Sequence, residues 1–200
     1  RGLRVYRRES LTEHGLRYSA YAIKTAEGLI TLGSLPERYS QMWADAVTSL
    51  GGGLDVKWSV FFGVDGDAAA CKEILSRFPG ATVTGNDNVL ENLEAALGKL
   101  SHKLLIRTSR TLTFGGKELS FHVISDNHEV PSLYLVDSEN AALINADAFG
   151  SDCAPGEDRV SALNDLTDYL SGAELYFADI YGKRRHKAME KAVALVREKN

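Results

Sequence analysis

Cysteine is scarce in this chain, since its 200 residues include only Cys71 and Cys153. Two cysteines give no disulfide framework, so a reducing cytoplasm is the expected location. Long apolar runs are also missing, and none approaches the roughly 20 residues that a helix needs to cross a bilayer. The chain has no excess of positive charge either, because its net charge is −4. We therefore expect no membrane partner and no nucleic-acid partner.

Basic residues gather near the end of the sequence, between residues 183 and 199. A nucleic-acid surface is one interpretation of such a cluster. We adopt the other interpretation, a solvated helix face, because the whole chain is acidic and no aromatic residues alternate with the basic ones.

The remaining composition, 44% hydrophobic and 25% charged, suits one globular domain with a single sizeable core. Apolar periodicity predicts strands over residues 18–23, 28–32, 58–62, 81–84, 103–108, 111–114, 118–124, 132–136 and 141–145. It predicts helices over residues 36–50, 70–78, 87–97, 159–170, 173–181 and 183–198, the third capped by Asn86 or Asp87.

The connections between these elements indicate the fold class. Gly115 and Gly116 separate two strands and supply the positive φ angles of a two-residue hairpin turn. Regular alternation of strand and helix would predict one parallel sheet. The hairpins favour mixed sheets with helices outside, which is a layered α/β sandwich.

Five stretches of the sequence are similar to motifs that occur together in one protein family. Residues 15–23 resemble G-T-T-Y-N-A-Y-L-I, residues 62–70 lie where H-x-E-x-D-H-S-G belongs, and residues 128–133 resemble H-W-P-D-S-M. Residues 147–150 match D-A-F-G, and residues 173–180 resemble R-Y-Y-A-N-I. Their order and spacing resemble the metallo-β-lactamase fold, specifically the di-iron domain of flavodiiron proteins.

The resemblance implies a four-layer αββα metallo-β-lactamase-like sandwich with mixed sheets. Residues 1–200 are expected to form a single domain of this kind. The family has a later P-S-H-G loop, whereas this sequence stops at Asn200. We therefore expect the domain to lack the family's last strand and loop, and we expect no flavodoxin-like domain within these residues.

The same resemblance implies which positions would hold metal. The first iron would use the positions of Gly63, Asp65, His128 and Asp147, of which three keep a ligating side chain. Bound iron or zinc normally needs three protein ligands. The two-histidine, one-carboxylate pattern of non-haem iron needs two imidazoles, and only that of His128 is present.

The second iron would use the positions of Asp67, Ala68 and Asp147 and a last histidine from the P-S-H-G loop. Only two of these four are ligands, and Asp147 is the bridge between the metals. An intact di-iron centre is therefore not expected. The cofactor is expected to be either none or one weakly held iron, zinc or manganese ion on Asp65, His128 and Asp147.

Each remaining ligand position also has a simpler interpretation. Asp67 precedes an apolar-periodic helix and is expected to be its N-cap, with metal ligation as the alternative. Asp65 lies in a turn rich in Gly and Asp, and His128 lies in a polar loop. Asp147 follows a strand, where an Asp also stabilises turns.

Three functions are open at this point. The first hypothesis is a structural or interaction module with a degenerate di-iron site. The second is an oxidoreductase that reduces O₂ or NO at a remodelled mononuclear site, and the third is a metal-dependent hydrolase. The resemblance implies a homodimer and a flavodoxin-like domain or electron-transfer partner, with FMN only in a domain that follows Asn200.

Overall fold

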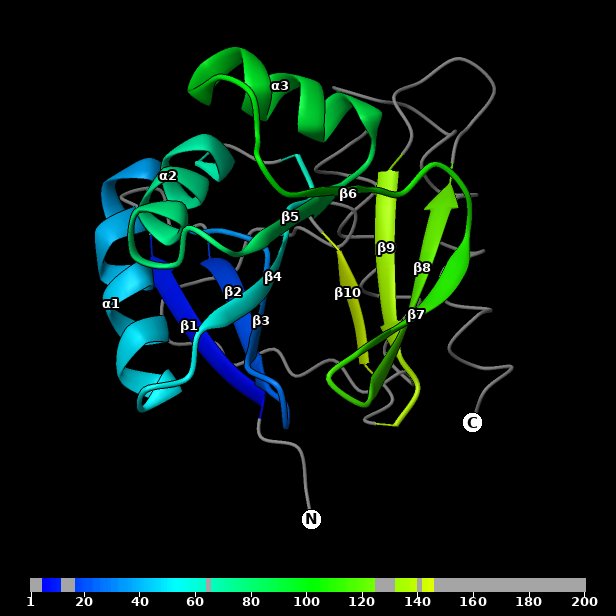
Figure 1. Cartoon of the computed structure of the whole chain (residues 1–200), viewed down its shortest axis with the longest axis horizontal. Helices are drawn as coiled ribbons and strands as arrows, with labels where there is room; N and C mark the ends of the chain where they lie inside the picture. The colour runs from blue at the N-terminus through cyan, green and yellow to red at the C-terminus, as the bar shows by residue number, and fades with distance from the viewer. Residues whose placement is uncertain (1–4, 12–16, 64–65, 125–131, 140–141, 146–200) are drawn as a thin grey trace.

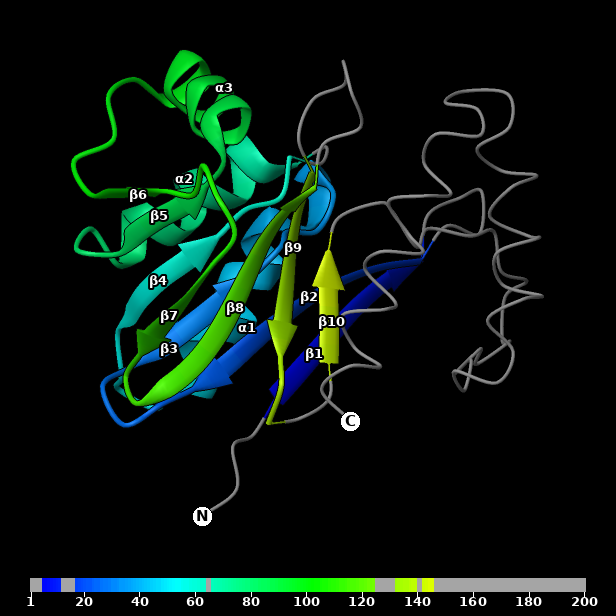
Figure 2. The ribbon, with the colours of Figure 1, turned by 90° about the vertical axis from the view of Figure 1, so that its right-hand side faces the viewer.

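The computed structural model describes residues 5–11, 17–63, 66–124, 132–139 and 142–145. Three layers are visible in this part of the chain (Figure 1). Helices cover one face of a larger sheet, called sheet A, and a smaller sheet, called sheet B, lies against the other face. Figure 2 looks onto sheet B, with sheet A behind it.

Sheet A has six strands in the order of the sequence, from β1 to β6. The first three strands are antiparallel neighbours, and β3 to β6 run parallel to one another. A mixed sheet was predicted, and its bounds are β1 Val5–Leu11, β2 Arg17–Lys24, β3 Leu29–Leu32, β4 Val56–Val60, β5 Thr82–Gly85 and β6 Lys103–Leu105.

Helices between the parallel strands pack on one face of sheet A, as crossover connections require. They are α1 Ser40–Gly51, preceded by the 3-10 turn η1 Glu37–Tyr39, and then α2 Asp67–Arg77 and α3 Asp87–Leu97. Their apolar stripes carry buried residues such as Trp43, Val47, Ile74 and Leu93, which share one core with sheet A residues such as Val83. Among the described residues, no helix is long and apolar enough to cross a membrane.

Sheet B has four antiparallel strands in the order β10-β9-β8-β7. The strands are β7 Arg110–Phe114, β8 Lys117–Ile124, β9 Ser132–Asp137 and β10 Ala142–Asn145. The predicted Gly-Gly hairpin joins β7 to β8, with φ of 55° at Gly115 and 80° at Gly116. Gly115 also approaches Thr25 so closely that a Cβ would collide with its hydroxyl, so the hairpin rests against the β2–β3 turn.

A second core fills the space between the two sheets. Alternation along each strand sends one set of side chains to the helices and the other to sheet B. The second set meets side chains of sheet B. Fully buried members of this core are Ile23, Ile30 and Leu32 from sheet A and Phe114, Leu119 and Phe121 from sheet B. Phe114 makes edge-to-face contacts with Trp58 and Phe121, at centroid distances of 5.0 and 5.9 Å.

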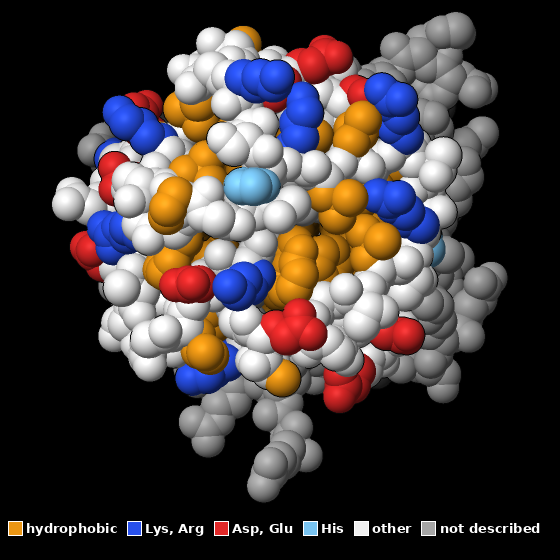
Figure 3. All heavy atoms as spheres, viewed as in Figure 1, with side chains coloured by type: hydrophobic (Ala, Val, Ile, Leu, Met, Phe, Trp, Pro, Cys, Tyr) orange, Lys and Arg blue, Asp and Glu red, His pale blue; other side chains and the backbone are white. Residues whose placement is uncertain are grey.

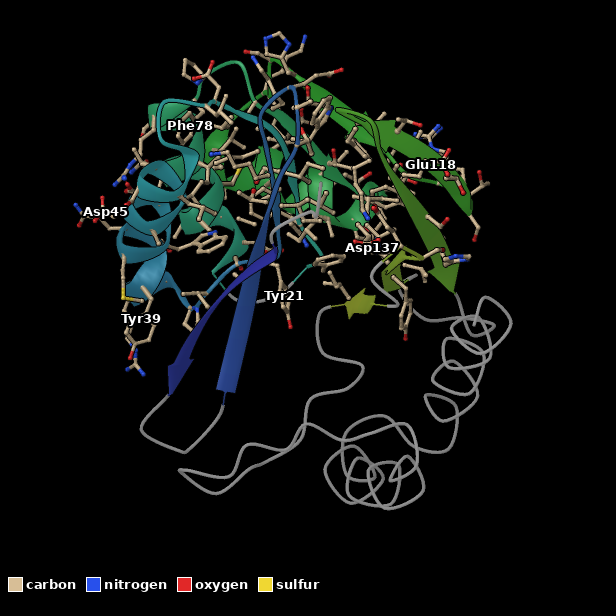
Figure 4. The ribbon with its side chains drawn as sticks, turned by 90° about the horizontal axis from the view of Figure 1, so that it is seen from below. Tyr21, Tyr39, Asp45, Phe78, Glu118 and Asp137 are labelled. Atoms are coloured by element: carbon tan, nitrogen blue, oxygen red, sulfur yellow. The ribbon has the colours of Figure 1, made fainter. Side chains whose placement is uncertain are left out.

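Lys117 is a buried charged residue beside the β7–β8 hairpin, at one end of sheet B. The Lys117 side chain is 3% exposed, and its Nζ donates to Asp137 Oδ1 and to Glu139 Oε2, each at 2.5 Å. Burial alone would lower the pKa of Lys117, but the hydrogen bonds to the two carboxylates outweigh burial and leave the pKa raised. In Figure 4, Asp137 lies on the sheet B side of the molecule, and Asp45 lies far from it on the outer side of α1.

Most predicted elements inside the described residues are confirmed, with shifted ends. The strand expected over residues 58–62 begins earlier and ends at Val60, and the strand expected over 103–108 ends at Leu105. Strand β1 was not predicted, because its sequence VYRRESL is mostly polar. The helices expected over residues 159–198 lie outside the described residues.

Candidate functional site

The positions expected to hold metal belong to the loops that follow the parallel strands. The carboxyl ends of neighbouring parallel strands meet at one edge of a sheet, where ligands bind in open α/β sheets. Ser34 follows β3, Gly63 follows β4, and Asn86 follows β5. Asp67 begins α2 in the same region, so this edge is the candidate site.

Asp67 is the one expected ligand with a side chain among the described residues. It is 5% exposed, and Ser34 beside it is 4% exposed. The Ser34 hydroxyl donates to Asp67 Oδ1 at 2.6 Å, and the Gly63 backbone N–H donates to Oδ2 at 2.8 Å. Both carboxylate oxygens therefore accept hydrogen bonds from the protein. We call these three residues the Asp67 network.

The Asp67 network joins two loops that are distant in sequence. Burying a carboxylate costs free energy unless donors replace the lost water. Here the hydroxyl, the backbone N–H and the positive end of α2 offset that cost. Since Ser34 and Asp67 are 33 positions apart, the network ties the loop after β3 to the loop after β4.

Gly66 brings the same two loops into direct contact. Its φ is 96°, in the left-handed region that favours glycine. A Cβ at this position would collide with the Leu35 carbonyl oxygen and lie 2.9 Å from the Glu37 nitrogen. The expected N-cap role of Asp67 is therefore wrong, because Gly66 is the N-cap and Asp67 is the first helical residue, with its side chain turned to the loops.

The two positions that the resemblance aligns with histidines of the family motif hold Gly63 and Ala68, and neither has a ligating side chain. Gly63 has a φ of 93°, and a Cβ there would lie 3.2 Å from Val89 Cγ2. A histidine at position 63 would therefore be strained in this backbone. Ala68 packs against the core between the helices and sheet A.

The other expected ligands, Asp65, His128 and Asp147, lie outside the described residues. Within the described ranges, no three or more His, Cys, Asp or Glu side chains are placed to hold a metal ion. Ser34 was not predicted as a site residue. Its place immediately after a buried strand and Gly33 is the signal that could have pointed to it, because such positions meet at the sheet edge.

Cys71 lies one helical turn after Asp67 and is fully buried in the helix-side core. Burial, with a smaller contribution from the Asp67 charge, raises the pKa of Cys71 to about 12. Its thiol is therefore protonated at neutral pH, which does not suit a nucleophile or a metal ligand. Cys71 is therefore a small buried residue of the helix-side core.

Comparison with solved structures identifies the fold. The flavodiiron protein from Giardia intestinalis superposes with a TM-score of 0.75 and 21% identity, over 95% of this chain and 50% of that one. A flavoprotein from Thermotoga maritima gives 0.74 and 16%, over 96% of this chain and 50% of that one. The chain has the flavodiiron-type metallo-β-lactamase-like fold. The predicted fold class is thus confirmed.

This flavodiiron-type fold extends over nearly the whole chain, which spans about half the length of these proteins. Rubredoxin oxygen:oxidoreductase from Desulfovibrio gigas has the same fold, with a TM-score of 0.70 and 19% identity over 93% of this chain and 47% of that one. No protein-family model matches the sequence, and no curated protein matches it either. The likeness therefore establishes the fold.

Proposed function

We propose that this chain is a flavodiiron-type domain with a degenerate di-iron site, acting as a structural or interaction module related to O₂ and NO reductases. One observation supports this most directly. At Asp67, the expected ligand that lies among the described residues, both carboxylate oxygens accept hydrogen bonds from Ser34 and Gly63. Protein donors thus occupy the side chain that would otherwise face a metal.

The neighbouring positions do not fit an iron pair either. Gly63 and Ala68 lack donor atoms, and the φ of 93° at Gly63 disfavours any larger residue. In this proposal the loops at the sheet edge are held by the Asp67 network and not by coordination.

We further propose the assembly around this domain. Residues 1–200 would form one metallo-β-lactamase-like domain in a cytoplasmic homodimer, with any FMN bound by a flavodoxin-like domain or an electron-transfer partner. The low cysteine content supports the location. The similarity to flavodiiron proteins supports the rest.

Metal content tests this proposal. The full chain would be purified without chelator or metal-affinity resin and analysed by inductively coupled plasma mass spectrometry, beside a His128→Ala variant. We expect iron, zinc and manganese far below one ion per chain in both. Near-stoichiometric metal that is lost in the variant would reject the proposal in favour of the alternative, an oxidoreductase with a mononuclear site on Asp65, His128 and Asp147.

A further inference from the structure

Val89 packs between the loops that follow two neighbouring strands at the candidate site. It is the third residue of α3 and is 4% exposed. A Cβ at Gly63, in the loop after β4, would lie 3.2 Å from Val89 Cγ2. A Cβ at Gly85, the last residue of β5, would lie 2.7 Å from Val89 Cγ1. The two methyl groups of Val89 therefore fill the space that side chains at positions 63 and 85 would need.

Several contacts hold Val89 in this place. Its N–H donates to the Asn86 side-chain oxygen at 3.0 Å, which fixes the start of α3. The buried residues of α3 include Val89 and Leu93, whereas charged side chains lie over α3 at the surface of the molecule (Figure 3). A Val in a helix has one strongly preferred side-chain rotamer. Rotation of Val89 away from Gly63 is therefore costly, and its other methyl group has no room to move toward Gly85.

The backbone of Gly63 is fixed as well. Its φ is 93°, in the left-handed region that residues other than glycine rarely adopt. Its N–H donates to Asp67 Oδ2 at 2.8 Å, and the Ser34 hydroxyl holds Asp67 Oδ1 at 2.6 Å. Because Asp67 follows only four residues later, a change of φ at Gly63 would disturb this hydrogen bond.

We propose that Val89 closes position 63 to any ligating side chain, so that restoring the two histidines of the motif would not restore a metal site. The inference rests on the proposed function and adds a cause to it. The site is degenerate because of the packing around Gly63 as well as the missing side chains. A histidine at position 63 would need a strained φ and would also have to displace Val89. Val89 is thus a positioning residue for the loop after β4.

Paired substitutions test the packing directly. Gly63→Ala adds only a Cβ, and Val89→Ala removes the methyl groups that this Cβ would meet. Urea unfolding would be measured for the wild type, each single variant and the double variant. We expect Gly63→Ala to lower the urea midpoint clearly less in the Val89→Ala background than in the wild type, because the two positions are in contact.

Gly53→Ala is the matched control. The φ of Gly53 is 95°, close to the 93° of Gly63, but no atom of the described residues lies within 4 Å of a Cβ placed there. Gly53→Ala should therefore lower the midpoint equally in both backgrounds, and by less than Gly63→Ala does in the wild type. An effect of Gly63→Ala that is the same with and without Val89 would overturn the inference.

Metal content tests the consequence for the site. The full chain carrying Gly63→His and Ala68→His would be incubated with Fe(II) or Zn(II), desalted and analysed by inductively coupled plasma mass spectrometry, beside wild type treated in the same way. We expect far less than one ion per chain in both proteins. If urea unfolding shows that the histidine variant does not fold, the comparison of Gly63→Ala with and without Val89 decides the inference by itself.

The two samples separate this inference from the proposed function. Near one ion per chain in the histidine variant alone would overturn the inference and leave the proposed function standing. Near one ion per chain already in the wild type would reject the proposed function, and the inference with it.

Discussion

In the proposed function, single residues at the candidate site have roles that differ from those of the motif positions they resemble. Asp67 keeps the carboxylate of the family motif, but it accepts hydrogen bonds from Ser34 and Gly63. From the sequence, Asp67 could be singled out because of the motif. Ser34 could not, since a partner 33 positions away is found only when the order of strands is known.

Replacing Ser34 by Ala should destabilise the domain. The Asp67 carboxylate would lose a donor while remaining buried, which costs about 1.5–3 kcal/mol. Urea unfolding would measure the loss. Ser76→Ala is the matched control, because the Ser76 hydroxyl is exposed and bonds only the Glu73 carbonyl within α2. An equal, small effect of both variants would contradict the role of the Asp67 network.

Two buried threonines of sheet A should respond in opposite directions to replacement by Val. The Thr84 hydroxyl is fully buried and has no hydrogen-bond partner among the described residues, so Thr84→Val should raise the free energy of unfolding by about 1 kcal/mol. Thr31 shares a 2.6 Å hydrogen bond with Ser59, so Thr31→Val should lower it by about 1–3 kcal/mol. Urea unfolding of both variants checks the pair, and a destabilised Thr84→Val would show that its hydroxyl is satisfied.

Cys71 should make the free energy of unfolding decrease as the pH rises above 9. Its folded pKa of about 12 lies above the ordinary value of 9.0, so only the unfolded state ionises readily between these values. The contribution of the neutral thiol is complete below pH 9 and is lost as pH rises toward 12. The difference in unfolding free energy between wild type and Cys71→Ala should therefore be constant below pH 9 and shrink above it. A difference that does not change with pH would contradict the shift.

Among the elements, the β7–β8 hairpin offers the sharpest comparison. Gly115 and Gly116 both have positive φ, so replacement by Ala strains either position by about 1–2 kcal/mol. A Cβ at Gly115 would also collide with Thr25, whereas one at Gly116 meets nothing within 4 Å. Thermal unfolding should therefore show a clearly larger decrease in Tm for Gly115→Ala than for Gly116→Ala. Equal losses would mean that the hairpin does not rest on the β2–β3 turn.

Local sequence signals predicted the elements that contain residues with a strong conformational preference, such as turn glycines and helix-capping residues. The Gly-Gly turn required positive φ, and Asn86 does cap α3, with its side-chain oxygen accepting from the Val89 N–H at 3.0 Å. Strand β1 has no such signal. It is held by its ladder with β2, from Val5↔Ile23 to Leu11↔Arg17, and a pairing partner cannot be read from a polar sequence.

At the scale of the whole molecule, the hairpins in the middle of the sequence predicted mixed sheets, and motif order predicted the flavodiiron-type fold. For the candidate site, the sequence allowed the positions to be predicted but not the contacts between their side chains. Whether loops are joined by a metal or by protein donors depends on which side chains meet at the sheet edge. The Asp67 network and the φ of 93° at Gly63 are three-dimensional facts of this kind.

The central claim is that protein hydrogen bonds, and not a metal ion, hold this edge of sheet A. Thermal unfolding of the full chain, with chelator and then with increasing Fe(II), Zn(II) or Mn(II), tests it most directly. An ion that binds only the folded state would raise Tm as its concentration rises. We predict the same Tm in chelator and in metal. A Tm that falls in chelator and rises with one metal would contradict the account.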